Sequence, residues 1–498
     1  MNSKKWISLF LAMLLTVPAL AACGNDADET TADTSAQVET ETETAEPSIY
    51  DGYDYGGKAL RIFSSINEFD STNAHHLIAG TGETNGEIVN DAVFARNAAV
   101  EEGLNIKLEF TPCDWNYAEN TDGLTQIVLA GEDLYDVIIN DVLALVNCAK
   151  AGYMRTIREE YLSMDSGWWY TDAMECLEVI PDVNFFLMGD FFADCLNSAH
   201  VLYYNKDVIL DNYGDSGYVE DLIFEGNWTI DEVMSIMETC AVDVDGDGTY
   251  KEGDLMGFYV DGLGSLAPMM GSLGVEYLKK GPDGSNILDF NTEHSVKVAE
   301  KISELYNSPY FITKSFGYAE ERIQFFAGRN TVIMGYQRLG DLQRMRDIEF
   351  DVGIAVYPKL DTAQESYRTN LHDTTEIGGV LGTVSDDNLE FIFTCLDFLS
   401  RTAAESVIPV WYEEALKVKY SSGTEEAQMI DLIRDTIDNP FYVFYSPALH
   451  YNVIYTFLDC AGSKNLDFAS NYAKKDPSTQ SAYQELIAGY QSAVDAGM

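Results

Sequence analysis

The pattern of hydrophobic and polar positions predicts that strands alternate with helices in the first part of the chain. Apolar runs of strand length lie at 59–64, 105–110 and 135–140, and apolar positions at helical spacing lie at 87–103, 121–130 and 142–151. This alternation is typical of an α/β fold with a parallel sheet, whose ligands bind at the carboxyl ends of the strands. Asn67 and Asp141 follow two of these strands, so both are candidate ligand-binding residues.

The same alternation returns in the middle of the chain, whereas the end of the chain has a different pattern. Strands are predicted at 201–206, 331–336 and 350–355, and a helix opens near 227–232. Thr229 followed by Glu232 fits a capping box, which assigns Thr229 to a helix cap rather than to a ligand contact. After residue 386 the spacing is chiefly helical. At roughly 100–200 residues per domain, the length suggests about two to four domains.

The N-terminus predicts export and a lipid anchor. Residues 1–22 have two early lysines, an apolar run too short for a confident membrane span, and small residues, as in a secretory signal peptide. The junction Leu20-Ala21-Ala22-Cys23 resembles a bacterial lipobox, in which Cys23 receives a diacylglycerol and becomes the first residue of the mature chain. Acyl chains on Cys23 would hold the protein on the extracellular face of the cell membrane, as in Gram-positive bacteria. The alternative is ordinary signal cleavage beside an incidental cysteine.

Residues 23–54 are predicted to be a disordered tether that links the lipidated cysteine to the folded body. From residue 24 to about residue 48 there is no lysine, arginine or aromatic residue, and eight acids repel one another. An acidic interaction tail is the alternative interpretation of this segment.

Composition excludes several classes of protein. The net charge of −52 argues against a nucleic-acid binder and against electrostatic docking on an anionic membrane. A surface with one dominant sign of charge also resists self-association, so a monomer is expected. Hydrophobic residues make up 46% of the chain, which excludes wholesale disorder. The eight cysteines are scattered and form no CxxC pair, so we expect mostly free thiols and no cysteine–zinc site.

The most specific local motif is an acidic loop at 243–254 that predicts a structural calcium ion. Carboxylates stand at loop positions 1, 3, 5 and 12, glycine stands at position 6, and position 7 can supply a backbone carbonyl. The predicted ligands are Asp243, Asp245, Asp247, Thr249 and Asp254. An EF-hand usually has glutamate at position 12, so the aspartate there weakens a sensor role more than calcium binding itself. The alternative is an acidic, glycine-rich turn without a metal.

The search for catalytic motifs indicates a binding protein rather than an enzyme. The chain has no Gly-x-Ser-x-Gly elbow, no His-Glu-x-x-His motif and no P-loop. Aromatic residues are abundant instead, and sugar rings stack on aromatic faces while acidic and amide side chains bind their hydroxyls. Four aromatic residues are predicted near the ends of elements and are candidate ligand contacts: Tyr259, Tyr336, Trp411 and Tyr412.

The order and spacing of several segments resemble one known family. These segments are 86–97, 135–138, Trp168-Trp169, 202–206, 227–231, the acidic loop and 412–417, behind a lipobox and an acidic tether. Together they resemble the extracellular solute-binding lipoproteins, family 1, which feed sugar ABC importers. The resemblance covers nearly the whole body from about residue 55.

The resemblance implies an α/β, two-lobe, periplasmic-binding-protein-like fold of type II. Its hinge would consist of crossover strands near 199–203 and 374–382, and its C-terminal part would be helical. Lobe one would combine 55–200 with 378–405, and lobe two would combine 201–377 with 406–498. The partners would be a sugar or oligosaccharide, captured by hinge closure, and an ABC permease. A secreted carbohydrate-active enzyme and a surface adhesin are the alternatives, and amino-acid or peptide ligands also stay open.

Overall fold

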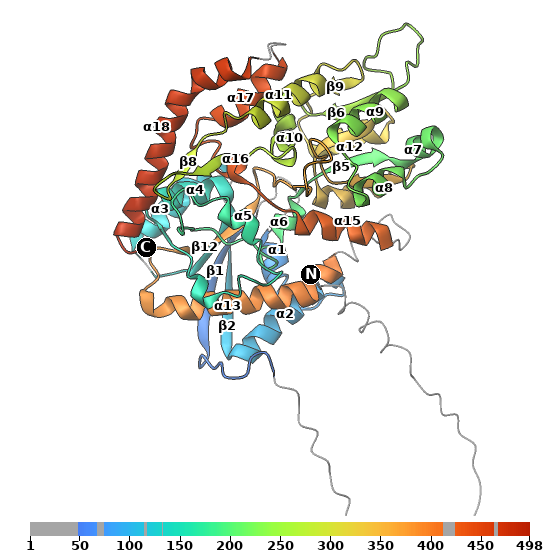
Figure 1. Cartoon of the computed structure of the whole chain (residues 1–498). Helices are drawn as coiled ribbons and strands as arrows, with labels where there is room; N and C mark the ends of the chain where they lie inside the picture. Colours follow the sequence, from blue (N-terminus) through green and yellow to red (C-terminus); the bar gives the residue numbers. More distant parts are fainter. Residues whose placement is uncertain (1–47, 67–73, 114–116, 132, 412–423, 463–466) are drawn as a thin grey trace, which may run out of the picture. The chain divides into compact units, whose positions relative to one another are not determined.

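The computed structural model describes residues 48–66, 74–113, 117–131, 133–411, 424–462 and 467–498 (Figure 1). Three residues singled out from the sequence, Cys23, Asn67 and Tyr412, lie outside the described residues. The signal peptide and nearly all of the predicted tether also lie outside them. Residues 50–498 belong to one unit, to which the following description applies.

The first lobe is built on a mixed five-stranded sheet with the order β2-β1-β3-β12-β4. β1 runs parallel to β2 and to β3, whereas β12 runs antiparallel to β3 and to β4. The bounds are β1 Lys58–Ser65, β2 Ile106–Cys113, β3 Val137–Asp141, β4 Met154–Arg155 and β12 Glu376–Leu381. The parallel core confirms the strands and the strand direction that the hydrophobic pattern predicts. The antiparallel β12 comes from a part of the chain more than 200 residues away.

Helices flank this sheet, and the hydrophobic pattern predicts three of them, near 87–103, 121–130 and 142–151. They are α1 Ala74–Ala79, α2 Ile88–Leu104, α3 Tyr117–Ala130, α4 Val142–Lys150, α5 Thr171–Glu175, α6 Asp194–Asn197 and α13 Leu389–Thr402. α2 begins at Glu87, whose carboxylate accepts hydrogen bonds from the backbone N–H groups of Val89 and Asn90, and it ends at Asn105 in the left-handed conformation. α2 and α13 pack on each other (Figure 1).

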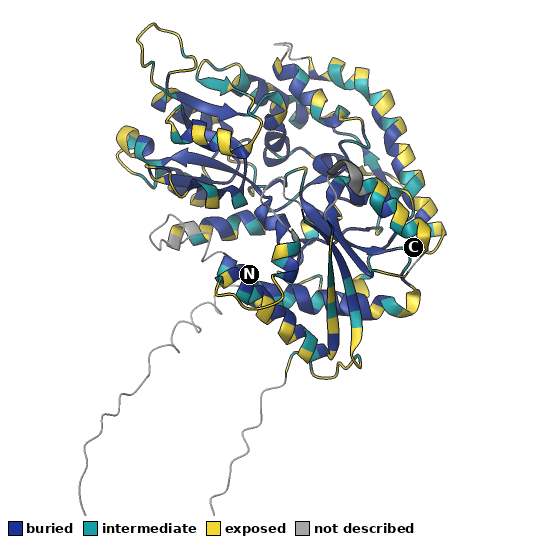
Figure 2. Cartoon of the chain, turned by 180° about the vertical axis from the view of Figure 1, so that it is seen from behind, coloured by how far each residue is buried: buried dark blue, intermediate teal, exposed yellow. Residues whose placement is uncertain are grey.

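The second lobe is built on another mixed five-stranded sheet, with the order β11-β5-β10-β6-β9. The bounds are β5 His200–Asn205, β6 Met256–Val260, β9 Phe311–Thr313, β10 Thr331–Arg338 and β11 Val352–Ala355. β5 is antiparallel to β10 and β11, and β6 is parallel to β10 and β9. β5, β6 and β11 are buried throughout, because helices and loops cover both faces of the sheet (Figure 2).

The remaining elements complete the second lobe and the C-terminal part. They are the hairpin of β7 Leu278–Lys280 and β8 Asn286–Leu288, and the helices α7 Lys206–Tyr213, α8 Tyr218–Phe224, α9 Ile230–Cys240, α10 Ala267–Ser272, α11 Glu293–Tyr306, α12 Ala319–Ala327, α15 Thr424–Asp435, α16 Phe441–Phe444, α17 Asn452–Gly462 and α18 Phe468–Asp495. The hydroxyl of Thr229 accepts a hydrogen bond from the Glu232 N–H at 3.4 Å, which confirms Thr229 as the N-cap of α9. After residue 386 the described chain is helical apart from its loops, as the sequence predicts.

Two segments carry the chain between the sheets, and they run side by side. The first segment, 198–200, leads from α6 into β5, and the second, 370–375, leads back into β12. The His200 N–H donates to the Asn370 carbonyl at 2.8 Å, and the His372 N–H donates to the Ser198 carbonyl at 3.0 Å. Two sheets joined by hydrogen-bonded crossings confirm the predicted two-lobe architecture. The lobe boundaries proposed from the sequence stay a prediction.

Helix α18 contacts elements of both lobes. Near its middle the Gln480 side chain donates to the Leu288 carbonyl at 2.8 Å, and the Tyr483 hydroxyl donates to the Asn286 carbonyl at 3.1 Å. Just beyond its end the Met498 carbonyl accepts a hydrogen bond from the Thr156 hydroxyl at 2.9 Å, and α18 also packs on α4. α18 is therefore a third connection between the lobes.

Two further observations concern the part of the chain that the structure describes. Every cysteine among the described residues is a free thiol, and all but Cys176 are buried, which confirms the expectation of free cysteines. Burial raises the pKa of the Cys148 thiol to about 12, so this thiol stays protonated and unreactive. None of the helices in the described ranges is both long enough and apolar enough to cross a membrane.

Candidate ligand-binding site

A cavity of about 340 Å³ lies against the two crossing segments. His200, Leu371 and Asp373 line it from the crossings, Leu143 lines it from α4, and the rest of its wall comes from the second lobe and the C-terminal helices. The volume falls at the lower end of the range for small-molecule sites, roughly 300–1,000 Å³. Residues from both lobes and from the crossings thus meet at one concave site.

Four tyrosines contribute to the apolar part of the cavity wall, beside aliphatic residues. Tyr451 and Tyr455 line the cavity and are 45% and 47% exposed. Tyr336 and Tyr442 also line it. Half-exposed aromatic rings facing a cavity offer flat apolar surfaces to a ligand.

Two of these tyrosines have strained backbones. Tyr336 has a φ of 58° and Tyr451 has a φ of 56°, and His450, beside Tyr451, has a φ of 57°. The left-handed region is uncommon for residues with bulky side chains and costs energy, so it persists where the surrounding structure imposes it. Such strain clusters at functional sites, and here two of the strained residues, Tyr336 and Tyr451, line one cavity.

The position of Tyr336 follows from a bulge in β10. The pairing of β10 with β5 shifts register between Met334 and Gln337, and a bulge of this kind redirects a side chain. The Tyr336 N–H donates to the Tyr357 hydroxyl at 2.7 Å, which holds the strained residue in place. The Tyr336 ring stacks on the imidazole of His200, with ring centroids 5.0 Å apart and an angle of 29° between the planes.

The polar part of the wall is acidic. The Asp373 side chain is 56% exposed, and Asp261 is held by Arg322 at 3.1 Å and by the Phe316 N–H at 3.0 Å. No lysine or arginine is found among the described residues that line the cavity. A wall of carboxylates, hydroxyls and aromatic rings suits a neutral ligand rich in hydroxyl groups and disfavours an anionic ligand.

Asp141 lies close to the cavity wall but does not line it. Its carboxylate caps α4 by accepting the Leu143 N–H at 2.8 Å, and Leu143 lines the cavity. The residue is 2% exposed, and its Oδ2 atom has no hydrogen-bond partner. Burial raises the pKa of Asp141 to about 7, and the negative charges of Asp373 and Asp194 add to the effect. Asp141 therefore changes its charge state near neutral pH.

The other aromatic residues proposed from the sequence lie in different places. Tyr336 lines the cavity. Tyr259 is buried in β6, where its ring packs on Phe325 and its hydroxyl donates to the Lys314 carbonyl at 2.9 Å. Trp411 is 5% exposed. Whether any of them contacts a ligand stays a prediction.

Four of the residues that line this wall are not among those predicted from the sequence: His200, Asp373, Tyr451 and Tyr455. The only local signal is the spacing of Tyr451 and Tyr455, four residues apart, which places both on one side of a helix start. His200 and Asp373 carry no such signal, because they meet only where the crossings pair.

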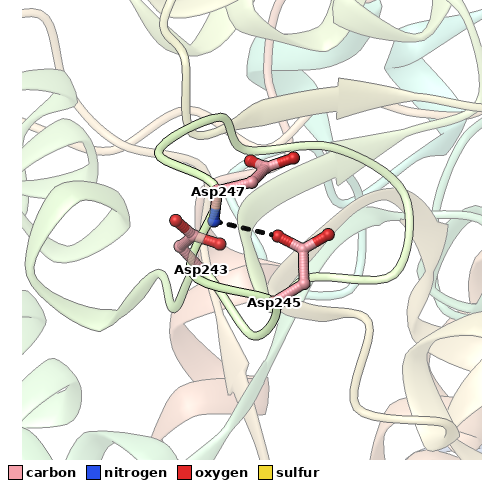
Figure 3. Close-up of side chains that lie close together, drawn as sticks. All are labelled: Asp243, Asp245 and Asp247. Carbon is pink, nitrogen blue, oxygen red and sulfur yellow. Dashed lines mark hydrogen bonds between the residues drawn. The ribbon is translucent and has the colours of Figure 1, made fainter.

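The acidic loop is a separate site, more exposed than the cavity. Oxygen atoms of Asp243, Asp245 and Asp247 lie within 4.8 Å of one another (Figure 3). The Gly246 and Gly248 N–H groups donate to the Asp243 carboxylate at 2.8 and 2.7 Å, so the loop is wrapped around its acids. Figure 3 also shows the hydrogen bond from the Asp247 N–H to Asp245, which measures 3.1 Å.

The two remaining predicted calcium ligands occupy different environments in the same loop. Asp254 is 3% exposed, and its carboxylate accepts the N–H groups of Val244 at 3.0 Å and Lys251 at 2.9 Å. The Thr249 N–H donates to the Asp247 carboxylate at 2.8 Å. The predicted calcium ligand is a different atom of the same residue, its carbonyl oxygen. The Lys251 ammonium lies between Asp245, at 2.8 Å, and Asp247. This donor set of carboxylate oxygens fits a hard cation such as Ca²⁺, and Lys251 supplies a tethered positive charge at the same place.

Comparison with known proteins identifies the fold. No family model matches the chain, and no curated protein matches it in sequence. The structure matches a cyclo/maltodextrin-binding protein complexed with maltotetraose, with a TM-score of 0.52 and 12% identity over 88% of this chain and 97% of that chain. The chain thus shares the two-lobe fold of a sugar-binding protein. The resemblance drawn from the sequence is confirmed at the level of the fold.

Two further structural matches have lower scores. One is the maltose/maltodextrin-binding domain from Bdellovibrio bacteriovorus bound to maltotriose. Its TM-score is 0.47 and its identity is 14%, over 86% of this chain and 100% of that chain. The other is an ABC substrate-binding protein from Listeria monocytogenes in complex with cycloalternan, with a TM-score of 0.48 and 13% identity over 86% of this chain and 98% of that chain.

Proposed function

We propose that this chain is the solute-binding protein of an ABC importer and that it captures a sugar or oligosaccharide in the cavity at the crossings. The observation that carries the proposal is the cavity itself, where strained tyrosines and carboxylates gather between two lobes. Tyrosine rings stack on the C–H faces of a sugar, and carboxylates accept hydrogen bonds from its hydroxyls. Closure of the lobes around the ligand would stabilise the form that the permease recognises.

The test is a thermal-shift screen with maltose, maltotriose, maltotetraose and cycloalternan, followed by calorimetry on each sugar that stabilises the protein. Tyr455→Ala removes one half-exposed ring from the cavity wall and is expected to weaken binding about tenfold or more. Tyr318→Ala is the matched control, because Tyr318 is 64% exposed and does not line the cavity. Equal affinity of the two variants would place the sugar elsewhere.

The same preparation separates the proposal from its two rivals. A secreted carbohydrate-active enzyme would release new reducing ends from an oligosaccharide, and a reducing-end assay detects them. A surface adhesin would bind a large partner without closure, so X-ray scattering would show no compaction with any small saccharide. We expect compaction and no hydrolysis.

The attachment to the membrane is a second part of the proposal. The sequence Leu20-Ala21-Ala22-Cys23 supports lipidation of Cys23, and the acidic segment behind it would hold the body away from the membrane. A lipid-anchored receptor on the extracellular face can deliver its ligand to a permease in the same membrane.

The acidic loop supports a third part of the proposal, a structural calcium ion held by Asp243, Asp245, Asp247, Thr249 and Asp254. The loop has hard oxygen donors at the spacing that calcium requires, and calcium is abundant outside cells. The ion would tie the loop to β6, which begins two residues after Asp254. A chelator should then lower the melting temperature, and an unchanged melting temperature without bound calcium would refute this part alone.

A further inference from the structure

His200, which lines the cavity, has a buried hydrogen-bonding atom that nothing in the protein uses. The residue is 2% exposed and lines the cavity, and its Nδ1 atom has no hydrogen-bond partner. A buried polar atom without a partner costs free energy, which a ligand or an ordered water can recover. We propose that His200 Nδ1 is a specificity-determining ligand contact that accepts a hydrogen bond from a sugar hydroxyl. This inference rests on the proposed function and deepens it.

The imidazole of His200 is neutral, so one of its two nitrogen atoms can accept a hydrogen bond. Burial, together with the neighbouring His372, lowers the pKa of His200 well below its usual value, so the ring is neutral near pH 7. Nδ1 has no partner in the protein, so the proposal places the single proton of the neutral ring on Nε2 and leaves Nδ1 as an acceptor.

The surrounding chain fixes the orientation of the ring. The His200 N–H donates to the Asn370 carbonyl of the other crossing, so the backbone of His200 belongs to the hinge. Tyr336 stacks on one side of the imidazole, and the ring of His372 lies 5.3 Å from it, tilted by 41°. Tyr336 reaches this position only through the β10 bulge and its strained φ of 58°. A structure that maintains such strain next to an unpartnered acceptor is preorganised for a ligand.

The acceptor predicts the chemical class of the ligand. His200, Asp261 and Asp373 line the cavity and have acceptor atoms, and no lysine or arginine is found among the described residues that line it. The complementary ligand supplies hydroxyl donors and has no negative charge, as a neutral saccharide does. Phosphorylated sugars and sugar acids would bring an anion toward Asp373 and find no cation on this wall.

Two variants separate the acceptor from the ring. His200→Phe keeps a ring for Tyr336 to stack on and removes the acceptor, whereas His200→Asn keeps an acceptor oxygen close to the position of Nδ1. Affinities are measured by calorimetry for maltotriose, maltotetraose and cycloalternan, with glucose 6-phosphate and glucuronate as the anionic probes. We expect His200→Phe to weaken binding of the neutral saccharide about tenfold or more and His200→Asn to weaken it less. The anionic probes should not bind.

Each outcome decides a different question. If the wild-type protein binds none of the probes, the proposed function fails and this inference fails with it. If a neutral saccharide binds the wild-type protein and both variants equally, or if an anionic probe binds more tightly, only the assignment of His200 is overturned. Nitrogen-15 NMR of histidine-labelled protein gives a readout without any ligand: His200 should be the neutral Nε2–H tautomer at pH 7, and a proton on Nδ1 would overturn the assignment.

Discussion

Asp141 gives the sharpest quantitative prediction, because its carboxyl group has a pKa of about 7 in the native protein against an ordinary value of 3.8. The native state therefore binds a proton more tightly than the unfolded state does. Stability gained from this proton is present at low pH and is lost as the pH rises through about 7. Ionised and buried at pH 8, Asp141 costs the native state about 4 kcal/mol, at roughly 1.4 kcal/mol for each pH step between the two pKa values.

The substitution Asp141→Asn removes the charge and keeps the helix cap. The amide oxygen can accept the Leu143 N–H, and the amide nitrogen replaces the unpartnered Oδ2 with a donor near Asp194 and Asp373. We expect the variant to be more stable than the wild type at pH 8 by about 2–4 kcal/mol. At pH 5 this advantage should shrink by about 2.7 kcal/mol, because the wild-type carboxyl is then protonated.

The assay is urea unfolding of both proteins at pH 5 and pH 8. Tryptophan fluorescence and far-UV circular dichroism both monitor the transition. Coincident transitions justify a two-state free energy, and the difference between variant and wild type cancels every other group that titrates. Asp467→Asn is the matched control, because Asp467 also caps a helix, α18, but is fully exposed. An advantage of the Asp141 variant that is the same at both pH values would refute the reasoning.

Three further predictions follow from other sites. Replacing Lys251 by glutamine removes the tethered cation from the acidic loop and should tighten calcium binding severalfold in a chelator-competition titration; weaker binding would contradict its assigned position. Cys23→Ala should release the protein from the membrane fraction into the medium, and retention on the membrane would exclude the lipid anchor. Arg434→Met leaves the fully buried Asp190 carboxylate without its ion pair and should destabilise the protein by about 3–5 kcal/mol in urea unfolding; a loss below about 1 kcal/mol would show that the pair is not needed.

The fold was predictable from the sequence because its elements have local signatures. β1, β3 and α2 appear as apolar runs and helical spacing in the hydrophobic pattern, and Thr229 and Glu232 mark the start of α9. The antiparallel β12 was not predictable in this way. Its pairing with β3 depends on a contact between segments more than 200 residues apart, which no local pattern records.

The site was less predictable, for three physical reasons. Tyr259 and Tyr336 both belong to strands of the second sheet, but that sheet is covered on both faces, so periodicity does not distinguish a core tyrosine from a cavity tyrosine. Tyr451 adopts a left-handed conformation that glycine or asparagine usually signals. His200 reaches the cavity only because two distant crossings pair side by side.

The attachment of α18 to both lobes has a mechanical consequence. With 28 residues, this helix is about 42 Å long, and it is tied to the β7–β8 hairpin near its middle and to Thr156 just past its end. Two crossings alone would let the lobes bend and twist about many axes. The part of α18 after Pro477 joins these two attachment points and resists stretching, so rotations that would lengthen it are disfavoured and the easiest rotation is about an axis that passes near α18. The lobes of this protein should therefore rotate about one axis, and the largest displacement should occur on the side away from α18.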